Sequence, residues 1–341
     1  MFRRTLVVAL PAALLLAGGC ADQSVGEKPG SAGSAAADYP SKTLQIMAPA
    51  GAGGGWDTTA RSMQKVFQDA GLLKNQTAEV RNVTGAAGTI GLAELVTSHQ
   101  KDAHQLMVTG LVMVGGVVTN KSPIDLSKTT PIATLTAESE VVVVRKDSKY
   151  TTLKQLADDI KANPTSVKWG GGSAGGTDQI LVGLFAKAAG ADAKAVAKQY
   201  VAYSGGGETK AALLSGDVSV AVSGTSEFAD LVKSGDVRAL AVSSATGQDA
   251  GAGTPTQSIK EQGYDLELMN WRGVVAPPGL SADERTAVLK LVDDLHNSEQ
   301  WKAELTAKNW QDFYKSGDEA VAFYESESTR IKTVLTEIGL G

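Results

Sequence analysis

The sequence predicts an α/β fold with two medium-sized lobes. Short apolar runs of strand length alternate with segments of helical periodicity from Lys42 onward, and the same alternation resumes in the middle of the chain. Such alternation is typical of βαβ units, whose strands form parallel sheets. A chain of 341 residues, 43% of them hydrophobic, is long and apolar enough for two ordinary cores.

The first α/β unit starts with the apolar run 44–50, which predicts a strand. A second strand is predicted over 78–83 and a second helical segment over 91–96. The helix between the two strands has an apolar face made of residues at helical spacing: Ala60, Met63, Phe67 and Ala70.

The second unit starts with a strand over 140–147. Thr152 and Gln155 have the spacing of a capping box, so we expect a helix from Leu153. A strand over 166–170 follows, and the next helix again has an apolar face: Ile180, Leu184 and Ala188.

The rest of the chain continues this alternation. Strands are predicted over 198–203, 218–224 and 238–244, with a short helix over 208–216 and a further run over 267–279. Two long helices near the C-terminus are expected to start at the capping boxes Ser281-x-x-Glu284 and Ser316-x-x-Glu319.

The N-terminus has the features of an export signal. Two arginines precede the apolar run 6–17, which is too short to span a bilayer, and small residues follow it. The only cysteine, Cys20, comes directly after them, as in bacterial lipoprotein signals, although an ordinary signal peptide with an incidental cysteine is the alternative. We therefore expect residues 1–19 to be removed and Cys20 to be lipidated, which would place a membrane-anchored protein outside the cytoplasm.

Residues 20–38 are rich in Gly, Ser and Ala, and they predict a flexible tether between lipid and fold. The formal net charge is -5, and the chain has no cluster of basic residues. A nucleic-acid partner is therefore not expected. If this acidic protein binds an anion, it needs positive potential at the site itself.

Glycine-rich loops could supply that potential. Three of them, 49–58, 85–91 and 170–178, lie where a strand leads into a helix. Free N–H groups at helix starts carry partial positive charge and hold anions, and no arginine is required. Glycines also serve tight turns alone, but three loops of one arrangement favour binding. Hydroxyl groups would add donors: Thr58, Ser173 and Thr177.

Four charged residues near these loops have more than one explanation. Asp57 and Asp178 are interpreted as caps that shape the loops, with ligand contact as the alternative. Arg61 has the i,i+4 spacing for an ion pair with Asp57. Arg272 could reach a carboxylate, and stacking or a structural ion pair is as good an explanation.

The chain shows no motif for catalysis or metal binding. None of its three histidines has a partner at metal-ligand spacing, and it lacks a G-x-S-x-G elbow and a P-loop. Gly170, Gly172 and Gly175 match G-x-G-x-x-G, but no acidic residue follows the next strand to hold a ribose. A dinucleotide-dependent enzyme is therefore a minor alternative, and we expect no catalytic residue, metal or cofactor.

Over residues 38–341 the chain resembles the extracytoplasmic receptors of tripartite tricarboxylate transporters, also called the Bug family. The resemblance rests on eight segments in the family's order: YPSKTLQIMAPAGAGGGWDTTAR, NVTGAAGTIG, VTGLVMVGGV, PIATLT, WGGGSAGGTD, VAYSGGGETKAALLSGDVSVAV, VRALAVSS and NWRGVVAPPG. The GGGWD and NWRGVVAPPG forms look most like the tricarboxylate-binding branch. The resemblance thus implies a receptor for citrate or a related tricarboxylate.

The resemblance also implies a two-lobed periplasmic-binding-protein type II fold, each lobe a mixed sheet flanked by helices. Lobe 1 would combine 39–139 with 244–341, and lobe 2 would be 140–243. The lobes would close on the ligand like a flytrap, and membrane permease subunits would recognise the closed form. A ligand sensor of the same fold would share every sequence feature.

Carried over by position, the ligand-binding residues come from two facing loops and one strand end. In the first lobe they are Gly51, Gly53, Gly54, Gly55, Trp56, Asp57 and Thr58. In the second lobe they are Gly172, Ser173, Ala174, Gly175, Gly176, Thr177, Asp178 and Tyr203.

Overall fold

The computed structural model describes residues 38–341. The predicted signal peptide, Cys20 and all of the tether except its last residue lie outside the described residues. Within 38–341, no helix combines the length and the apolar character that a membrane span needs.

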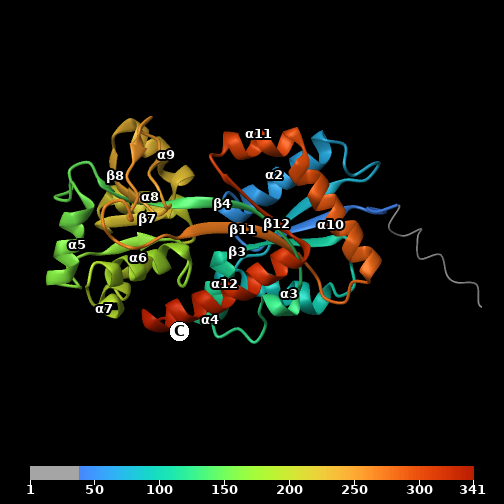
Figure 1. The fold of residues 1–341 in the computed structure, drawn as a ribbon, viewed down its shortest axis with the longest axis horizontal. Helices are drawn as coiled ribbons and strands as arrows, with labels where there is room; N and C mark the ends of the chain where they lie inside the picture. Colours follow the sequence, from blue (N-terminus) through green and yellow to red (C-terminus); the bar gives the residue numbers. More distant parts are fainter. Residues whose placement is uncertain (1–37) are drawn as a thin grey trace, which may run out of the picture. The chain divides into compact units, whose positions relative to one another are not determined.

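The strands form a ten-stranded sheet whose two halves share the long strand β4 (Thr130–Arg145). Up to Ser139, β4 pairs with one set of strands, and from Glu140 onward it pairs with another. Figure 1 shows β4 running from one group of helices and strands to the other.

In the first half, parallel and antiparallel pairs occur together. β1 (Leu44–Ala48) is parallel to β2 (Ala78–Asn82) and β3 (Gln105–Gly110), while β11 (Met269–Ala276) is antiparallel to both β3 and β4. β12 (Gln311–Ser316) also pairs with β4. The strand β11 comes late in the chain and yet lies between β3 and β4.

The second half is likewise mixed. β5 (Trp169–Gly171) is parallel to β6 (Tyr200–Ala202) and β7 (Val220–Gly224), and β4 is antiparallel to β7 and β8 (Val237–Val242). A separate two-stranded sheet joins β9 (Gln248–Asp249) and β10 (Pro255–Thr256). The prediction of two α/β units with mixed sheets is confirmed.

Helices flank both halves. Those before β4 are α2 (Gly55–Asp69), the short 3₁₀ turn η1 (Ala86–Gly88), α3 (Thr89–Ser98), α4 (Leu111–Thr119) and the 3₁₀ turn η2 (Leu126–Lys128). Those of the second half are α5 (Leu153–Ala162), α6 (Thr177–Ala188), α7 (Ala193–Ala197), α8 (Gly206–Ser215) and α9 (Thr225–Ser234). The C-terminal helices are α10 (Ala282–Asn297), α11 (Glu299–Ala307) and α12 (Gly317–Glu337).

Two of the three predicted capping boxes are confirmed. The boxes at Thr152 and Ser281 have both reciprocal hydrogen bonds, and α5 and α10 start where predicted. The prediction of a capping box at Ser316 is wrong. Ser316 is the N-cap residue of α12, but its side chain makes no capping hydrogen bond. The carboxylate of Glu319 instead accepts a hydrogen bond from Lys315 Nζ at 2.7 Å, so it is drawn away from the N-cap.

The apolar face predicted for α2 is buried except at its end, with Ala60, Met63 and Phe67 fully inaccessible and Ala70 half-buried. The face predicted for α6 is wrong in part, because Ile180 is buried but Leu184 is only half-buried and Ala188 is exposed.

The C-terminal end of α12 packs on α6, where a Cβ on Gly183 would lie 2.6 Å from the Ile338 side chain. Lys187 and Glu337 form an ion pair at 2.6 Å beside this contact. The last helix therefore contacts an element of the second half.

Candidate ligand-binding site

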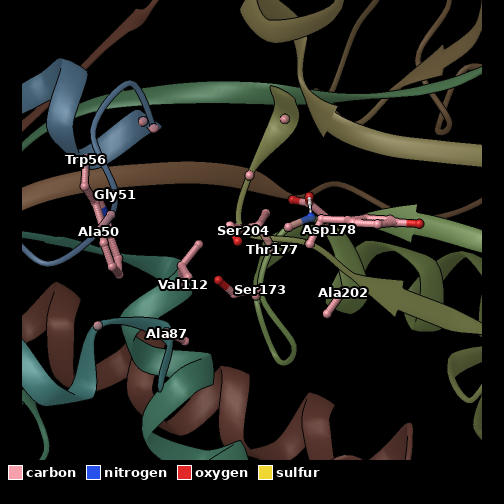
Figure 2. Close-up of a pocket in the computed structure, with 18 of the residues that line it drawn as sticks. Ala50, Gly51, Trp56, Ala87, Val112, Ser173, Thr177, Asp178, Ala202 and Ser204 are labelled. Atoms are coloured by element: carbon pink, nitrogen blue, oxygen red, sulfur yellow. Dashed lines mark hydrogen bonds between the residues drawn. The ribbon is translucent and has the colours of Figure 1, made fainter. Parts of the chain in front are cut away.

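A cavity of about 800 Å³ lies between the loops that precede α2 and α6. Its lining comes from both halves of the sheet and includes the turn 84–88, the loop before α8 and the start of α9. Figure 2 shows Trp56 and Gly51 on one side of the cavity, and Ser173, Thr177 and Asp178 on the other.

The loop before α2 is held by a carboxylate in the first turn of that helix. Asp57 accepts hydrogen bonds from the Gly53 N–H at 2.8 Å, from Arg61 Nε at 2.9 Å and from Asn82 Nδ2 at 2.9 Å. Burial opposes ionisation of Asp57, but these bonds outweigh it and lower the pKa of the carboxyl group. Asp57 thus shapes the loop, and the predicted i,i+4 pair with Arg61 is present.

The loop before α6 uses the same device. The carboxylate of Asp178 accepts from the Gly172 N–H at 2.5 Å, and the side-chain oxygen of Gln179 accepts from the Gly175 N–H at 2.8 Å. The Tyr200 hydroxyl donates to the Gly172 carbonyl at 2.8 Å. Residues of the first helical turn therefore reach back and fix the loop.

Glycines on α4 let two loops approach this helix closely. A Cβ on Gly115 would lie 1.9 Å from the Gly175 carbonyl oxygen, and one on Gly116 would lie 2.6 Å from the Ala87 side chain. Trp56 packs in turn against Gly88, whose φ is +90° and whose Cβ would lie 2.6 Å from the indole. The helix α4 thus contacts loops on both sides of the cavity.

Five helices begin at the cavity with a glycine at the N-cap position: α3 with Gly88 and α9 with Gly224, and likewise α2, α6 and α8. The glycines of the last three, Gly54 of α2, Gly176 of α6 and Gly205 of α8, all line the cavity and give no side-chain cap to their helix. The first-turn N–H groups of a helix have no partner inside the helix. They are therefore available to a bound molecule.

Arg272 lies on β11 at the edge of the cavity, beside the start of α2. Its Nη2 donates to Glu138 Oε2 at 2.9 Å, and its guanidinium lies 5.5 Å from the ring centre of Trp310. A Cβ on Gly55 would be 2.6 Å from Nη2. The ion pair and the aromatic contact are thus both present, and the side chain also lines the cavity.

Four carboxyl groups gather where β4 changes partners: Glu138, Glu140, Asp178 and Glu227. Burial and the neighbouring carboxylates raise the pKa of Glu140 well above its usual value. Burial, with a further contribution from Glu227, raises the pKa of Asp178 to about 7. The pKa of Glu227 is also raised, chiefly by burial. Part of this cluster is therefore protonated at neutral pH.

The structure brings most of the predicted site residues into one cavity. Those in the lining are Gly51, Gly54, Gly55, Trp56, Gly172, Ser173, Ala174, Gly176, Thr177, Asp178 and Tyr203. Gly53, Asp57, Thr58 and Gly175 are outside it. Gly53 and Asp57 bond to each other, the Thr58 N–H bonds to the Gly54 carbonyl, and Gly175 lies against Thr119.

The prediction of site residues missed several polar groups of the lining. They are Asn120, Glu208, Ser223, Glu227 and Asn270. Ser223 and Glu227 stand at the end of β7 and the start of α9, so the rule that ligands bind beyond the carboxyl ends of strands could have indicated them. No local signal marks Asn120, which ends an apolar helix.

The sequence that forms this cavity and this sheet matches a known family. A model of the tripartite tricarboxylate transporter family receptor matches residues 61–340. The chain belongs to this receptor family. The receptor is similar to the protein BugT of Bordetella pertussis, with 25% identity over 306 residues that cover 88% of this chain and 90% of BugT. The predicted family is confirmed.

Solved structures share the receptor's fold. MatC from Rhodopseudomonas palustris, solved with bound malate, is 20% identical, with a TM-score of 0.73, 87% of this chain covered and 100% of MatC. A second R. palustris protein, solved with adipate, is 20% identical, with a TM-score of 0.75 and coverage of 89% and 99%. The predicted two-lobed binding-protein fold is confirmed, and family and fold are those of receptors that bind substrates.

Proposed function

We propose that this receptor binds a small organic carboxylate outside the cytoplasm, citrate or a related tricarboxylate, and delivers it to the permease subunits of a tripartite transporter. The observation that carries the proposal is the convergence of α2, α6 and α8 on one cavity, each with an uncapped glycine at its N-cap. Each helix start favours an anion by about 1 kcal/mol, and by up to about 2 kcal/mol when partly buried.

The charge of a carboxylate agrees with these donors. The hydroxyls of Ser173 and Thr177 line the same cavity beside the start of α6. Its volume of about 800 Å³ leaves room for a tricarboxylate with bridging waters. The malate and adipate in the two solved relatives support the carboxylate class.

We propose that capture of the ligand requires two lobes. Lobe 1 consists of 39–139 and 244–341, and lobe 2 consists of 140–243. The helix start of α2 comes from the first and those of α6 and α8 from the second, so only their approach surrounds the ligand. The strands β4 and β11, which link the two parts, are the natural hinge. Closure would exclude water and present one shape to the permease.

We further propose that acylated Cys20 anchors the receptor to the membrane and that residues 20–38 act as the tether. The names of solved relatives, among them a periplasmic binding protein called BugD, support a place outside the cytoplasm. Metabolic labelling with a radioactive fatty acid tests the anchor, because Cys20→Ala removes the only thiol in the chain.

Thermal unfolding of residues 21–341 with a panel of carboxylates tests the ligand class. A ligand present at 100 times its Kd stabilises the folded state by about 2.7 kcal/mol, which is a shift of several degrees. We expect citrate or a close tricarboxylate to give this shift. A shift with a nicotinamide dinucleotide and with no carboxylate would contradict the proposal.

A substitution at an N-cap position tests the mode of binding. Gly54 has backbone angles suited to any residue, and a Cβ there would lie 3.4 Å from its nearest neighbour. Gly54→Asp would cap α2 with its own carboxylate and occupy the N–H groups offered to the ligand. We expect Gly54→Asp to abolish citrate binding and Gly54→Ala to retain most of it.

A further inference from the structure

The cluster of four carboxyl groups beside the cavity, of which Asp178 and Glu227 line it, has more carboxyl groups than positive partners. Glu138 is paired with Arg272, but within 38–341 no lysine or arginine forms an ion pair with Glu140, Asp178 or Glu227. Arg272 and, more weakly, Lys210 are the cations that act on Glu227, and neither forms an ion pair with it. A site that only held carboxylates would gain nothing from this surplus, because like charges repel.

Glu227 lines the cavity together with Asp178, and its carboxyl group is held through one oxygen only. The Ser223 hydroxyl donates to its Oε2, and the start of α8 packs so closely on Oε2 that a Cβ on Gly206 would lie 2.0 Å away. Among the described residues, none donates a hydrogen bond to Oε1. The carboxylate is thus held in place with one acceptor free.

A second unsatisfied polar group lies in the same lining. Thr177 is completely buried, and its Oγ1 has no hydrogen-bond partner among the described residues. Buried polar groups are nearly always paired in native proteins. A free carboxylate oxygen and a free hydroxyl in one cavity therefore point to a bound molecule that supplies the missing partners.

Asp178 and Glu140 are the other two carboxyl groups without an ion pair, and both oxygens of Glu140 lack a hydrogen-bond partner among the described residues. Burial and the Asp178 carboxylate raise the pKa of Glu140, while burial and the Glu227 carboxylate raise the pKa of Asp178. Asp178 already accepts the Gly172 N–H. Asp178 is thus tied to the loop before α6, and Glu140 lies outside the cavity lining, which leaves Glu227 as the acceptor.

We propose that Glu227 determines specificity by accepting a hydrogen bond from the ligand, so that the preferred ligand carries a hydroxyl or ammonium group in addition to its carboxylates. The carboxylates lie at the starts of α2, α6 and α8, and the ligand's donor group lies at Glu227, with Thr177 in the same lining. This inference rests on the proposed carboxylate function and narrows its substrate class.

Matched ligands that differ in one donor test it. Titration calorimetry on the full receptor would compare citrate with tricarballylate, and malate and aspartate with succinate. A site built to hydrogen-bond a hydroxyl or amine rejects the analogue that lacks this group. In the series that the receptor binds, we therefore expect the ligand with the donor group to bind at least about tenfold more tightly than the ligand without it. Equal binding, or a preference for tricarballylate or succinate, would overturn the proposal.

Variants of Glu227 test whether this residue causes the preference for a donor-bearing ligand. They also distinguish a hydroxyl donor from an ammonium donor. For an ammonium ligand, Glu227→Gln removes the charge and should eliminate the preference. For a hydroxyl ligand, Glu227→Gln should retain part of the preference for the donor-bearing ligand, and Glu227→Leu should eliminate this preference. Glu319→Gln, also in the first turn of a helix but outside the cavity, should keep the preference of the unaltered receptor.

Unfolding curves without ligand show whether each variant is folded, and Gln and Leu give two independent chances of a folded protein. A preference unchanged in both Glu227 variants would overturn the role of Glu227. Carboxylate binding without donor preference would defeat this inference alone. Failure of every carboxylate to bind would defeat the proposed function, and this inference with it.

Discussion

Arg272 donates a hydrogen bond to Glu138 across 2.9 Å, with side chains only 7% and 1% exposed. The other oxygen of Glu138 accepts the Ser226 N–H at 2.8 Å. Arg272 is on β11 and Ser226 is at the start of α9, so one carboxylate connects the first half of the sheet with the second. This connection lies at the proposed hinge, and Arg272 also lines the cavity.

Breaking this pair should destabilise the protein strongly. Arg272→Met leaves the Glu138 carboxylate buried without its cation, and such changes cost about 3–5 kcal/mol. Urea unfolding measures the loss. The control is Lys154→Met at the exposed pair with Asp158, where we expect a change within about 0.5 kcal/mol. Equal effects of the two substitutions would contradict this account.

Asp178 should make stability depend on pH. Its pKa is about 7 in the folded state and near 3.8 in the unfolded chain, so between these values the folded state holds a proton that the unfolded state has lost. The free energy of unfolding should therefore fall as pH rises from about 4 to 7. Urea unfolding at several pH values should show a shallower fall in Asp178→Asn.

The contact between Gly115 and Gly175 should limit what α4 tolerates. A methyl group at 115 would lie 1.9 Å from the Gly175 carbonyl oxygen, so Gly115→Ala must push the α6 loop away from α4. We expect ligand affinity to fall by about tenfold or more, since a displaced loop loses its aligned donors. Gly207→Ala meets no atom within 4 Å and should bind normally in calorimetry.

The two C-terminal caps should differ in value although their sequence patterns match. Ser281 makes both bonds of its capping box, so Ser281→Ala should cost about 1 kcal/mol in thermal or urea unfolding. Ser316 makes no side-chain capping bond, and Ser316→Ala should change stability by only about 0.3 kcal/mol. Similar losses in both variants would mean that Ser316 caps α12 in solution.

Periodicity predicted the elements that have one apolar face. The α2 face with Met63 and Phe67 was found because polar residues alternate with it at helical spacing. The helix α4, LVMVGGVVT, was not predicted, because it is apolar on nearly all sides and so carries no period. The strand β12 was missed as well, since it pairs only at its two ends and buries little.

The glycine loops of the site were predictable because strand, glycines and helix start are adjacent in the chain. The cluster of carboxyl groups was not predictable, because its contacts join residues far apart in the chain. Glu138 and its partner Arg272 are 134 positions apart. Glu138 and Glu140 stand two residues apart in a strand, which places them on one face. Only the pairing of β4 on both sides shows that this face is buried.

The position of β11 dictates an order of assembly. The second lobe's strands, from Glu140 to Val242, are synthesised in one continuous stretch and can pair at once. The facing edges of β3 and β4 stay unpaired until residue 276 has been synthesised, because β11 pairs with both strands and lies between them. Until then the growing chain carries a half-built sheet with open edges, the condition in which strands aggregate most readily and a chaperone is most useful.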